Sequence, residues 1–471
     1  MNSAFATPTA SLDDPYYYLT NFRFVLAWVG ERHADLLSAD ERDFLEQFES
    51  LPQASQALLV RMVMRKGELF RLSKLSYTEV GDSAEAIASL VALGWVDNDP
   101  ALSVDELFNQ LRLAELRHIL ADEIRAAGLS VSSAKAMLYD TLTSQLTHTA
   151  PLQAWWPDAS DQIVRLKVME TCDRLRLMFF GNLRQDWAEF VLTELGLQRF
   201  ETVSFTPHSR AFQSRQEVDT YLALHQLRQR LDAGELPPDL HIEVPPCADN
   251  RWLATRRARL LLQLGREAER SGDAALALTL YHDSGSSEAR IRQLRVLERQ
   301  GEHQAAFELA SKALNSSPNE TEHQALSRLL PRLRRRLKLP ASPSDPEPVH
   351  ERWDLQLPGP QSVERAVAQT LGEPQAPVCY VENSLITGLF GLLCWSAIFA
   401  PLPGAFFHPF HNGPADLYRD DFVARRRDLF DACLARLEDG SYREVIQTTW
   451  REKAGLSSPF VHWAIVDEAL I

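Results

Sequence analysis

Residues 381–400 read VENSLITGLFGLLCWSAIFA, and the fold class depends on where this apolar run lies. No residue from 385 to 400 is charged, and Pro401 and Pro403 follow directly. A helix that crosses a bilayer needs about 20 consecutive apolar residues, and this run is shorter. We therefore predict a helix buried in a protein core, and we place membrane association through 385–400 behind it as the alternative.

Glu382 stands just before the apolar run, between Val381 and Asn383. A carboxylate at this position usually caps a helix or interacts with the positive end of its dipole. The alternative is a ligand for a hard cation, because Mg²⁺ and Mn²⁺ bind carboxylates on rigid elements and leave room for water and phosphate oxygens. Spacing alone favours the first role.

The segment after the run contains a group of polar residues and then an amphipathic pattern. His408, His411 and the nearby aspartates could form a metal site by composition, although local hydrogen bonds in a loop are the more ordinary role for them. From 422 onward the pattern predicts one amphipathic helix that ends at Gly440, with its arginines on the polar face. The aspartates of the group are Asp416, Asp420 and Asp421, and the arginines are Arg425, Arg426 and Arg427.

The composition is that of an ordinary globular chain of several domains. It has 471 residues, of which 45% are hydrophobic and 24% charged, with a net charge of −15. Any binding of nucleic acid must therefore rest on local basic surface. The five cysteines are far apart and form no C-x-x-C pair, and the first residues lack a signal-peptide pattern. We therefore expect a reducing, cytoplasmic location and no zinc site built on thiolates.

Residues 250–339 contain a helical repeat. LGREAERSGDAALAL at 264–278 resembles a TPR helix pair, and LERQGEHQAAFELASKAL at 297–314 follows the same pattern. Such pairs bury their apolar faces only by stacking on one another. Arginines precede, separate and follow the two repeats, which makes a surface for a polyanion plausible beside the plainer role of solubilising charge.

Residues 102–148 resemble a SAP domain, a small DNA-binding module. Leu111, Leu116 and Leu120 form a helical stripe, and Gly128 suits the left-handed position after the helix. A second helix is predicted to start near Ser133, where the family usually has Gly, and to carry Lys135. An ordinary helical hairpin remains the alternative.

The order of these parts resembles the Fanconi-associated nuclease family of the bacterial type, with a catalytic domain of the VRR-NUC class. The resemblance covers nearly the whole chain. It includes YYYLTNF at 16–22, LLVRMVMRKGELFRLSKLSY at 58–77, the run at 381–400, PADLYRDDFVARRRDLFDACL at 414–434 and SPFVHWAIVDEAL at 458–470. It implies a mainly α-helical, multi-domain chain that ends in the start of a restriction-endonuclease-like α/β nuclease domain.

The resemblance predicts six segments. They are an N-terminal helical DNA-binding region (1–101), the SAP-like domain (102–148), a mixed connecting region (149–249), the TPR-like region (250–339), a Pro-rich linker (340–375) and an incomplete nuclease domain (376–471).

The resemblance also implies an activity. Members are structure-specific DNA nucleases that cut 5′ flaps, degrade DNA from 5′ to 3′ and process interstrand cross-links with Mg²⁺ or Mn²⁺. Glu382 matches the first catalytic and metal-binding glutamate of the family. The family's downstream Asp and Glu-x-Lys are missing: Asp416 is not followed by such a pair, and Glu452 and Lys453 are adjacent. We therefore expect a truncated nuclease that binds branched or 5′-flap duplex DNA without cutting it.

The predicted DNA contacts are all basic. The family receives a 5′ phosphate in a basic pocket near the TPR region, for which the candidates are Arg290, Arg292 and Arg295. The candidates for backbone phosphates are Arg61, Arg65, Lys66, Arg117, Arg125 and Lys135. Arg61 and Arg65 are four positions apart, which predicts a shared helix face.

No nucleotide cofactor is expected, because the chain has no P-loop and no dinucleotide-binding fingerprint. The alternative function is a TPR-type scaffold that binds a protein partner and lacks nuclease activity.

Overall fold

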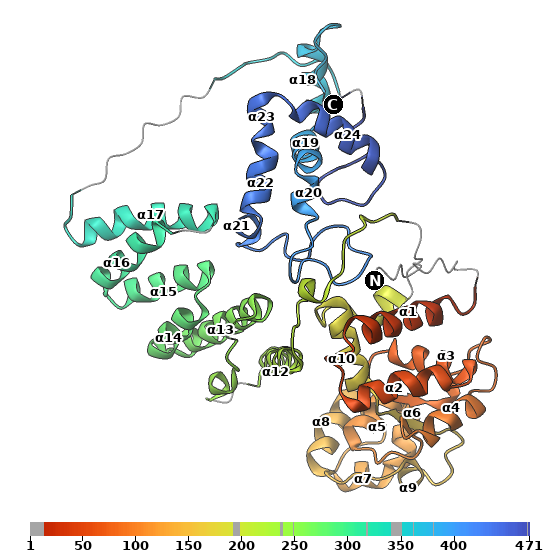
Figure 1. Cartoon of the computed structure of the whole chain (residues 1–471). Coiled ribbons are helices and arrows are strands. Elements are labelled where there is room, and N and C mark those ends of the chain that lie inside the picture. The colour runs from red at the N-terminus through yellow and green to blue at the C-terminus, as the bar shows by residue number, and fades with distance from the viewer. Residues whose placement is uncertain are drawn as a thin grey trace. The chain divides into compact units, whose positions relative to one another are not determined.

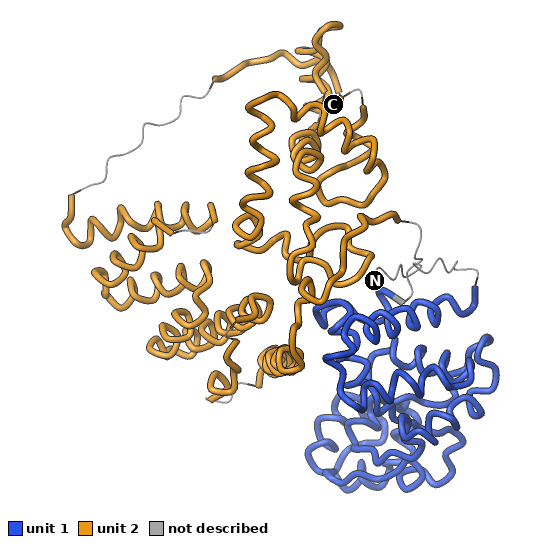
Figure 2. The backbone as a smooth tube through the Cα atoms, viewed as in Figure 1, with its two compact units in different colours: residues 1–197 blue, residues 198–471 orange. Residues whose placement is uncertain are grey.

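The computed structural model describes residues 14–191, 198–235, 239–247, 249–316, 319–340, 351–360, 362–379, 381–468 and 470–471. The chain forms two compact units, Met1–Leu197 and Gln198–Ile471 (Figure 2). Helices dominate both units (Figure 1), which confirms the mainly helical fold predicted from the sequence.

The first unit packs helices around one small sheet. The sheet has the order β1-β3-β2, and both pairings are antiparallel. Its strands are β1 (Leu69–Arg71), β2 (Val96–Asp97) and β3 (Ile163–Leu166). The helices are α1 (Tyr17–Arg32), α2 (Ala39–Ser50), α3 (Gln53–Val63), the 3₁₀ helix η1 (Leu72–Lys74), α4 (Ser83–Ala92), α5 (Val104–Gln110), α6 (Leu113–Ile119), α7 (Ala121–Ala126), α8 (Lys135–Gln145), α9 (Leu152–Trp155), α10 (Met169–Phe180) and α11 (Trp187–Val191).

Local capping signals position several of these helices. The Ser38 side chain accepts from the backbone N–H of Glu41, whose carboxylate accepts from the Ser38 N–H in return. Gly128 follows α7 with φ +72°, as its place after the helix predicts. The second helix of the SAP-like segment differs from the prediction, because it starts at Lys135 and has no side-chain cap from the preceding serines.

The second unit begins with η2 (Pro207–Ser209), α12 (Arg215–Asp232) and η3 (Leu240–Glu243), and then forms the predicted helical repeat. Successive helices of the repeat pack against one another around two apolar clusters, one that includes α13, α14 and part of α15 and one formed by α15, α16 and α17. They are α13 (Arg251–Ser271), α14 (Ala274–Ser284), α15 (Ser287–Arg299), α16 (His303–Leu314) and α17 (Glu320–Arg336).

The segment predicted as a Pro-rich linker is only partly extended. Residues 351–360 form no helix or strand and are exposed, whereas α18 (Val363–Leu371) is helical. Ser362 caps α18, and six of the segment's prolines precede that helix, so nothing in 363–371 prevents the helix from forming. The part of the linker at 341–350 lies outside the described residues.

The apolar run forms two short helices, α19 (Leu385–Leu393) and α20 (Trp395–Ile398), with Cys394 between them. Their side chains fill the core of the C-terminal part together with residues from 405–466. The buried-helix prediction is therefore confirmed for most of residues 388–400, whereas Ile386 in the first turn is exposed. The helix is also broken at Cys394, where φ is −101° and ψ is 17°. Within the described ranges, no helix combines the length and apolarity needed to cross a bilayer.

Two glycines allow α19 to pack closely against the last part of the chain. A Cβ on Gly388 would lie 2.8 Å from Val466, and a Cβ on Gly391 would lie 2.5 Å from Phe460. Both distances are shorter than real contacts allow, so the segment that contains Phe460 and Val466 can approach the helix only where a side chain is missing.

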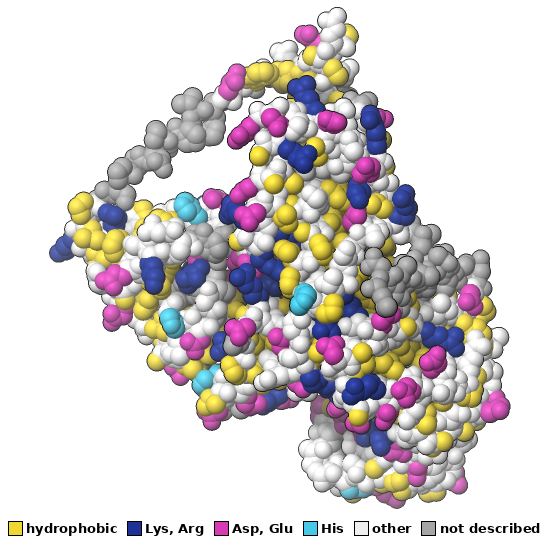
Figure 3. Space-filling view, viewed as in Figure 1, with side chains coloured by type: hydrophobic (Ala, Val, Ile, Leu, Met, Phe, Trp, Pro, Cys, Tyr) yellow, Lys and Arg dark blue, Asp and Glu magenta, His cyan; other side chains and the backbone are white. Residues whose placement is uncertain are grey.

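The long amphipathic helix predicted after 422 is divided into shorter pieces. They are α21 (Phe422–Arg425), α22 (Arg427–Leu434) and α23 (Arg436–Asp439), followed by Gly440 with φ +79° and then α24 (Tyr442–Lys453). The helix ends at Gly440 as predicted. The prediction of an arginine face was wrong at Arg426, whose side chain is fully buried. Hydrophobic side chains such as Leu429 and Leu437 remain exposed nearby, and Figure 3 shows apolar surface over this part of the molecule.

Candidate nucleic-acid interface

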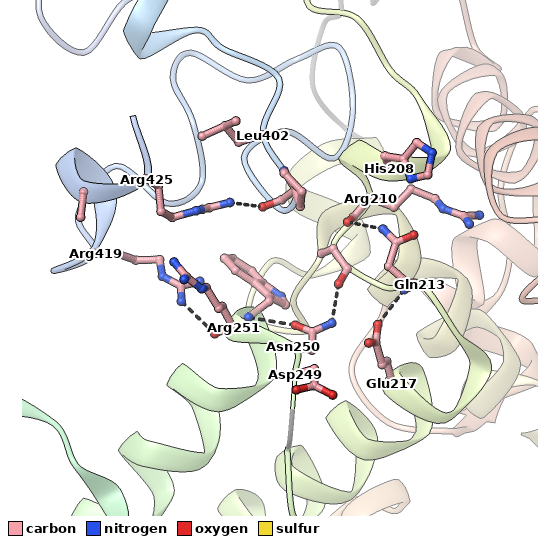
Figure 4. Close-up of a pocket in the computed structure, with 14 residues that line it drawn as sticks. His208, Arg210, Gln213, Glu217, Asp249, Asn250, Arg251, Leu402, Arg419 and Arg425 are labelled. Carbon is pink, nitrogen blue, oxygen red and sulfur yellow. Dashed lines mark hydrogen bonds between the residues drawn. The ribbon is translucent and has the colours of Figure 1, made fainter. Parts of the chain in front are cut away.

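A cavity of about 740 Å³ lies within the second unit, where the start of α13 meets the segments around 210 and 402–425 (Figure 4). Its charged lining is mostly basic, with four arginines against two acidic side chains. In Figure 3, Lys and Arg side chains gather where α13 and α15 lie beside α21. The lining residues are His208, Arg210, Ala211, Gln213, Glu217, Asp249, Asn250, Arg251, Trp252, Leu402, Pro403, Arg419, Ala424 and Arg425.

Asn250 fixes the start of α13 at this cavity. Its side-chain oxygen accepts from the N–H groups of Trp252 and Leu253, at 2.9 and 3.2 Å, which caps the 21-residue helix. Its amide nitrogen donates to the carbonyl of Ala211 at 2.7 Å and ties the opposite wall to the helix. The cavity therefore receives the positive end of a long helix dipole, which favours an anion.

Arg419 is held against that helix end. One guanidinium nitrogen donates to the carbonyl of Arg251 at 2.8 Å and to the hydroxyl of Thr255. The guanidinium also lies 5.6 Å from the ring centre of Trp252, a distance typical of a cation–π contact. Burial lowers the pKa of Arg419 from its ordinary value.

Trp252 lines the cavity and packs against several of its neighbours. Its ring lies 4.1 Å from the guanidinium of Arg256 and 5.2 Å from the ring of Phe407. Arg425 donates to the carbonyl of Pro403 at 2.6 Å. Figure 4 shows Arg419, Arg425 and Arg251 around the same side of the cavity.

The arrangement suits a phosphate. Arginine presents several N–H donors in a planar fork that matches phosphate oxygens, and it remains charged when partly buried. Phosphate contacts of this kind fix the register and orientation of a nucleic acid without reading its bases.

Arg61, Arg65 and Lys66, which were predicted to contact DNA, differ from one another in their burial and in their partners. Arg61 pairs with Glu79 at 2.5 Å and lies over the ring of Tyr18. Since α3 ends at Val63, Arg65 lies beyond the helix, and the prediction that it shares a helix face with Arg61 was wrong. Arg65 and Lys66 are exposed.

The basic residues of the SAP-like segment are mostly engaged locally. Arg117 donates to the carbonyls of Ser132 and Ser133, both at 2.9 Å, and so holds the turn before α8. Arg125 pairs with Asp122 on the surface. Lys135 is exposed and donates to the carbonyl of Leu111 at 3.2 Å. As contacts to DNA, these residues stay predictions.

The three arginines proposed for a 5′ phosphate do not line the cavity. Arg290 makes a two-pronged pair with the buried carboxylate of Glu322, at 2.7 and 2.9 Å. Arg292 lies 3.9 Å from Glu269, and Arg295 is exposed. Of the four cavity arginines, only two stood out in the sequence: Arg251, at the basic start of the repeat, and Arg425, on a supposed polar helix face. Arg210 and Arg419 were missed, because no local pattern marks them.

Glu382 lies in the turn before α19, where its carboxylate is exposed. The next residue, Asn383, has φ +56°, so the chain reverses direction at this carboxylate. In the described part of the chain, no group of three or more His, Cys, Asp or Glu side chains is placed to share an ion. The residues present therefore do not fit a complete Mg²⁺ or Mn²⁺ site.

The group around His408 and Asp416 is also not a metal site. Asp416 is paired with Arg426, Asp420 lies 3.3 Å from the hydroxyl of Ser287, and Asp421 lies 3.3 Å from Arg419. The carboxylates thus serve separate partners, which are local for Asp416 but not for Asp420, whose partner Ser287 lies 133 positions away.

The chain is similar to known proteins of one family along nearly its whole length. Residues 16–97 match the family model "FAN1, HTH domain", and residues 101–155 match "Fanconi anemia-associated nuclease SAP domain". The chain is 49% identical to the Fanconi-associated nuclease 1 homolog of Pseudomonas aeruginosa over 466 residues, which covers 98% of this chain and 82% of that protein. It is 22% identical to the human Fanconi-associated nuclease 1 and spans 54% of its length.

Two solved structures have the same fold. Both are crystal structures of paFAN1 with gapped 5′-flap DNA, one with a two-nucleotide flap (TM-score 0.82, 49% identity) and one with a one-nucleotide flap (TM-score 0.80, 48% identity). The likeness covers 98% and 97% of this chain, and 84% and 85% of the paFAN1 chains. With helix order, SAP segment and overall identity in agreement, this chain belongs to the Fanconi-associated nuclease 1 family.

Proposed function

We propose that this chain is the DNA-binding body of a structure-specific nuclease and that it binds duplex DNA with a 5′ flap. The observation that carries the proposal is the cavity at the start of α13, where four arginines gather in a chain of net charge −15. Two paFAN1 structures with flap DNA support it, since they share the fold at nearly half sequence identity.

In this proposal Arg419 and Arg425 each bind a phosphate of the DNA near the N-terminal, positive end of α13. Because both guanidiniums are fixed by carbonyl groups, little side-chain freedom is lost when the phosphate binds. The contact reads the geometry of the DNA and not its bases.

Phosphodiester hydrolysis is proposed from the family alone. It would comprise cleavage of 5′ flaps, 5′-to-3′ exonuclease action and processing of interstrand cross-links, with Mg²⁺ or Mn²⁺ as cofactor. Glu382 is the metal ligand proposed in the described residues. That residues 1–471 bind DNA without cutting it stays a prediction.

The test is binding of a 5′-flap duplex in EDTA, followed by fluorescence anisotropy at several salt concentrations. Arg419→Gln/Arg425→Gln should weaken binding about 10- to 100-fold, since each charge-assisted hydrogen bond contributes about 1.5–3 kcal/mol and part is replaced by water. The slope of log K against log salt should fall by about 1.8, at about 0.9 for each lost phosphate contact.

The matched control is Arg228→Gln, which removes an exposed arginine of α12 that pairs with Asp232 and does not line the cavity. It should bind as the parent does. A parallel sample with Mn²⁺ measures cleavage, and cleavage lost in Glu382→Ala would support Glu382 as metal ligand. If the parent chain does not bind flap DNA even at low salt, the nuclease proposal fails and the TPR-type scaffold remains.

A further inference from the structure

Asp416 is a carboxylate with no exposed surface in the segment that lines the cavity. Its two oxygens accept from the two terminal nitrogens of Arg426, both at 2.9 Å. Arg426 is also fully buried, and its guanidinium lies 4.2 Å from the ring centre of Phe422. One carboxylate and one guanidinium in two-pronged contact already balance each other in charge.

A second guanidinium nevertheless contacts the same carboxylate. Arg425 donates to Asp416 with one terminal nitrogen and to the carbonyl of Pro403 with the other, the latter at 2.6 Å. Arg425 lines the cavity, whereas neither Asp416 nor Arg426 does. The carboxylate of Asp416 and the two guanidiniums therefore carry a net charge of +1. Of the two guanidiniums, only that of Arg425 lines the cavity.

Asp416 also holds the backbone that carries the other arginine. The N–H of Arg419 donates to the carbonyl of Asp416 at 3.0 Å, and the neighbouring Ala415 donates to Ala405 at 2.7 Å. The same residue thus fixes one cavity arginine through its side chain and starts the turn that carries the second.

We propose that Asp416 is the positioning residue of this cavity: it holds Arg425 at a fixed place where it can bind a DNA phosphate. The inference rests on the proposed function. It assigns Asp416 no contact with DNA, so its effect must pass through Arg425.

Charge alone and positioning predict opposite effects of Asp416→Asn on the binding of DNA. Asp416→Asn removes a negative charge close to the cavity, which by charge alone would strengthen phosphate binding. Positioning predicts weaker binding, because Arg425 loses the carboxylate that orders it. The direction of the change therefore separates the two roles.

The experiment measures binding of the 5′-flap duplex in EDTA for Asp416→Asn, Arg425→Gln and the double variant. We expect each single variant to weaken binding by the same factor, about 3- to 10-fold, and the double variant to be no weaker than either. The salt slope should fall by about one in all three, since one phosphate contact is lost. Asp428→Asn, which removes an exposed carboxylate of α22, is the control for charge and should bind at least as well as the parent.

Asp416→Asn leaves Arg426 buried without a counter-ion and could unfold the segment. Asp416→Asn/Arg426→Met removes both charges of the buried pair and should restore the melting temperature while DNA binding remains as weak as in Arg425→Gln. Binding equal to or tighter than the parent in either Asp416 variant overturns the inference, as do losses that add in the double variant. Absence of flap binding by the parent chain would instead reject the proposed function.

Discussion

At the scale of single residues, the two histidines near the cavity give the chain a pH dependence. The rings of His408 and His411 lie 4.1 Å apart among aromatic side chains. Burial lowers the pKa of His411 to about 4, and burial together with His411 lowers the pKa of His408 well below its ordinary value. An unfolded histidine has a pKa near 6.5, so between pH 6.5 and 4 the unfolded chain binds more protons than the folded chain.

The free energy of unfolding should therefore be highest above pH 6.5 and fall as the pH is lowered toward 4. His411 alone contributes up to about 3 kcal/mol to this fall, at about 1.4 kcal/mol for each pKa unit. Urea unfolding between pH 7.5 and 4.5 measures it, with His411→Phe expected to flatten the profile. His323→Asn, an exposed histidine of α17, should keep the slope of the parent, and an unchanged slope in His411→Phe would contradict the prediction.

At the scale of elements, the close packing of α19 predicts a large effect of one methyl group. Gly391→Ala places a Cβ 2.5 Å from the Cβ of Phe460, and the backbone around both must move. Overpacking of this kind costs about 1–3 kcal/mol of unfolding free energy. Chemical denaturation measures the loss. Gly359→Ala is the control, because its Cβ would meet nothing within 4 Å, and an equal effect in both variants would show that packing is not the cause.

Elements were predicted well where the deciding residues are close in sequence. Gly128 and Gly440 each follow a helix with a left-handed backbone angle, and both signals can be seen without a structure. The break at Cys394 was missed because the run 385–400 carries no proline or charge to mark it. The strands were missed because they are only two to four residues long, and their pairing joins residues 68 to 96 positions apart.

At the scale of the whole molecule, all five cysteines are free thiols. Burial raises the pKa of the Cys172 thiol and raises that of Cys394 to about 12, so these groups are poor nucleophiles near neutral pH. The melting temperature should therefore be the same with and without dithiothreitol. Differential scanning calorimetry checks this, and a drop of several degrees on reduction would reveal a disulfide.

The fold class and the family could be predicted from the sequence, whereas the cavity could not. Arg419 contacts Arg251 across 168 positions, and no local pattern reports such a contact. Asp416 and Arg426 are ten positions apart, but their pairing requires a loop to turn inward and bury both charges, while an arginine run at helical spacing ordinarily faces water. The net charge of −15 indicated that any binding of DNA must rest on a local basic surface, but it did not indicate where that surface lies.

The contact between α19 and residues 460–466 also has a consequence for synthesis on the ribosome. Translation proceeds at about 5–20 residues per second, so α19 leaves the exit tunnel several seconds before Phe460 and Val466 are made. During that interval the face of α19 that later packs against Phe460 and Val466 is uncovered. Slow codons between 400 and 460 would prolong this interval, and a nascent-chain chaperone that recognises apolar segments would bind here before the domain can close.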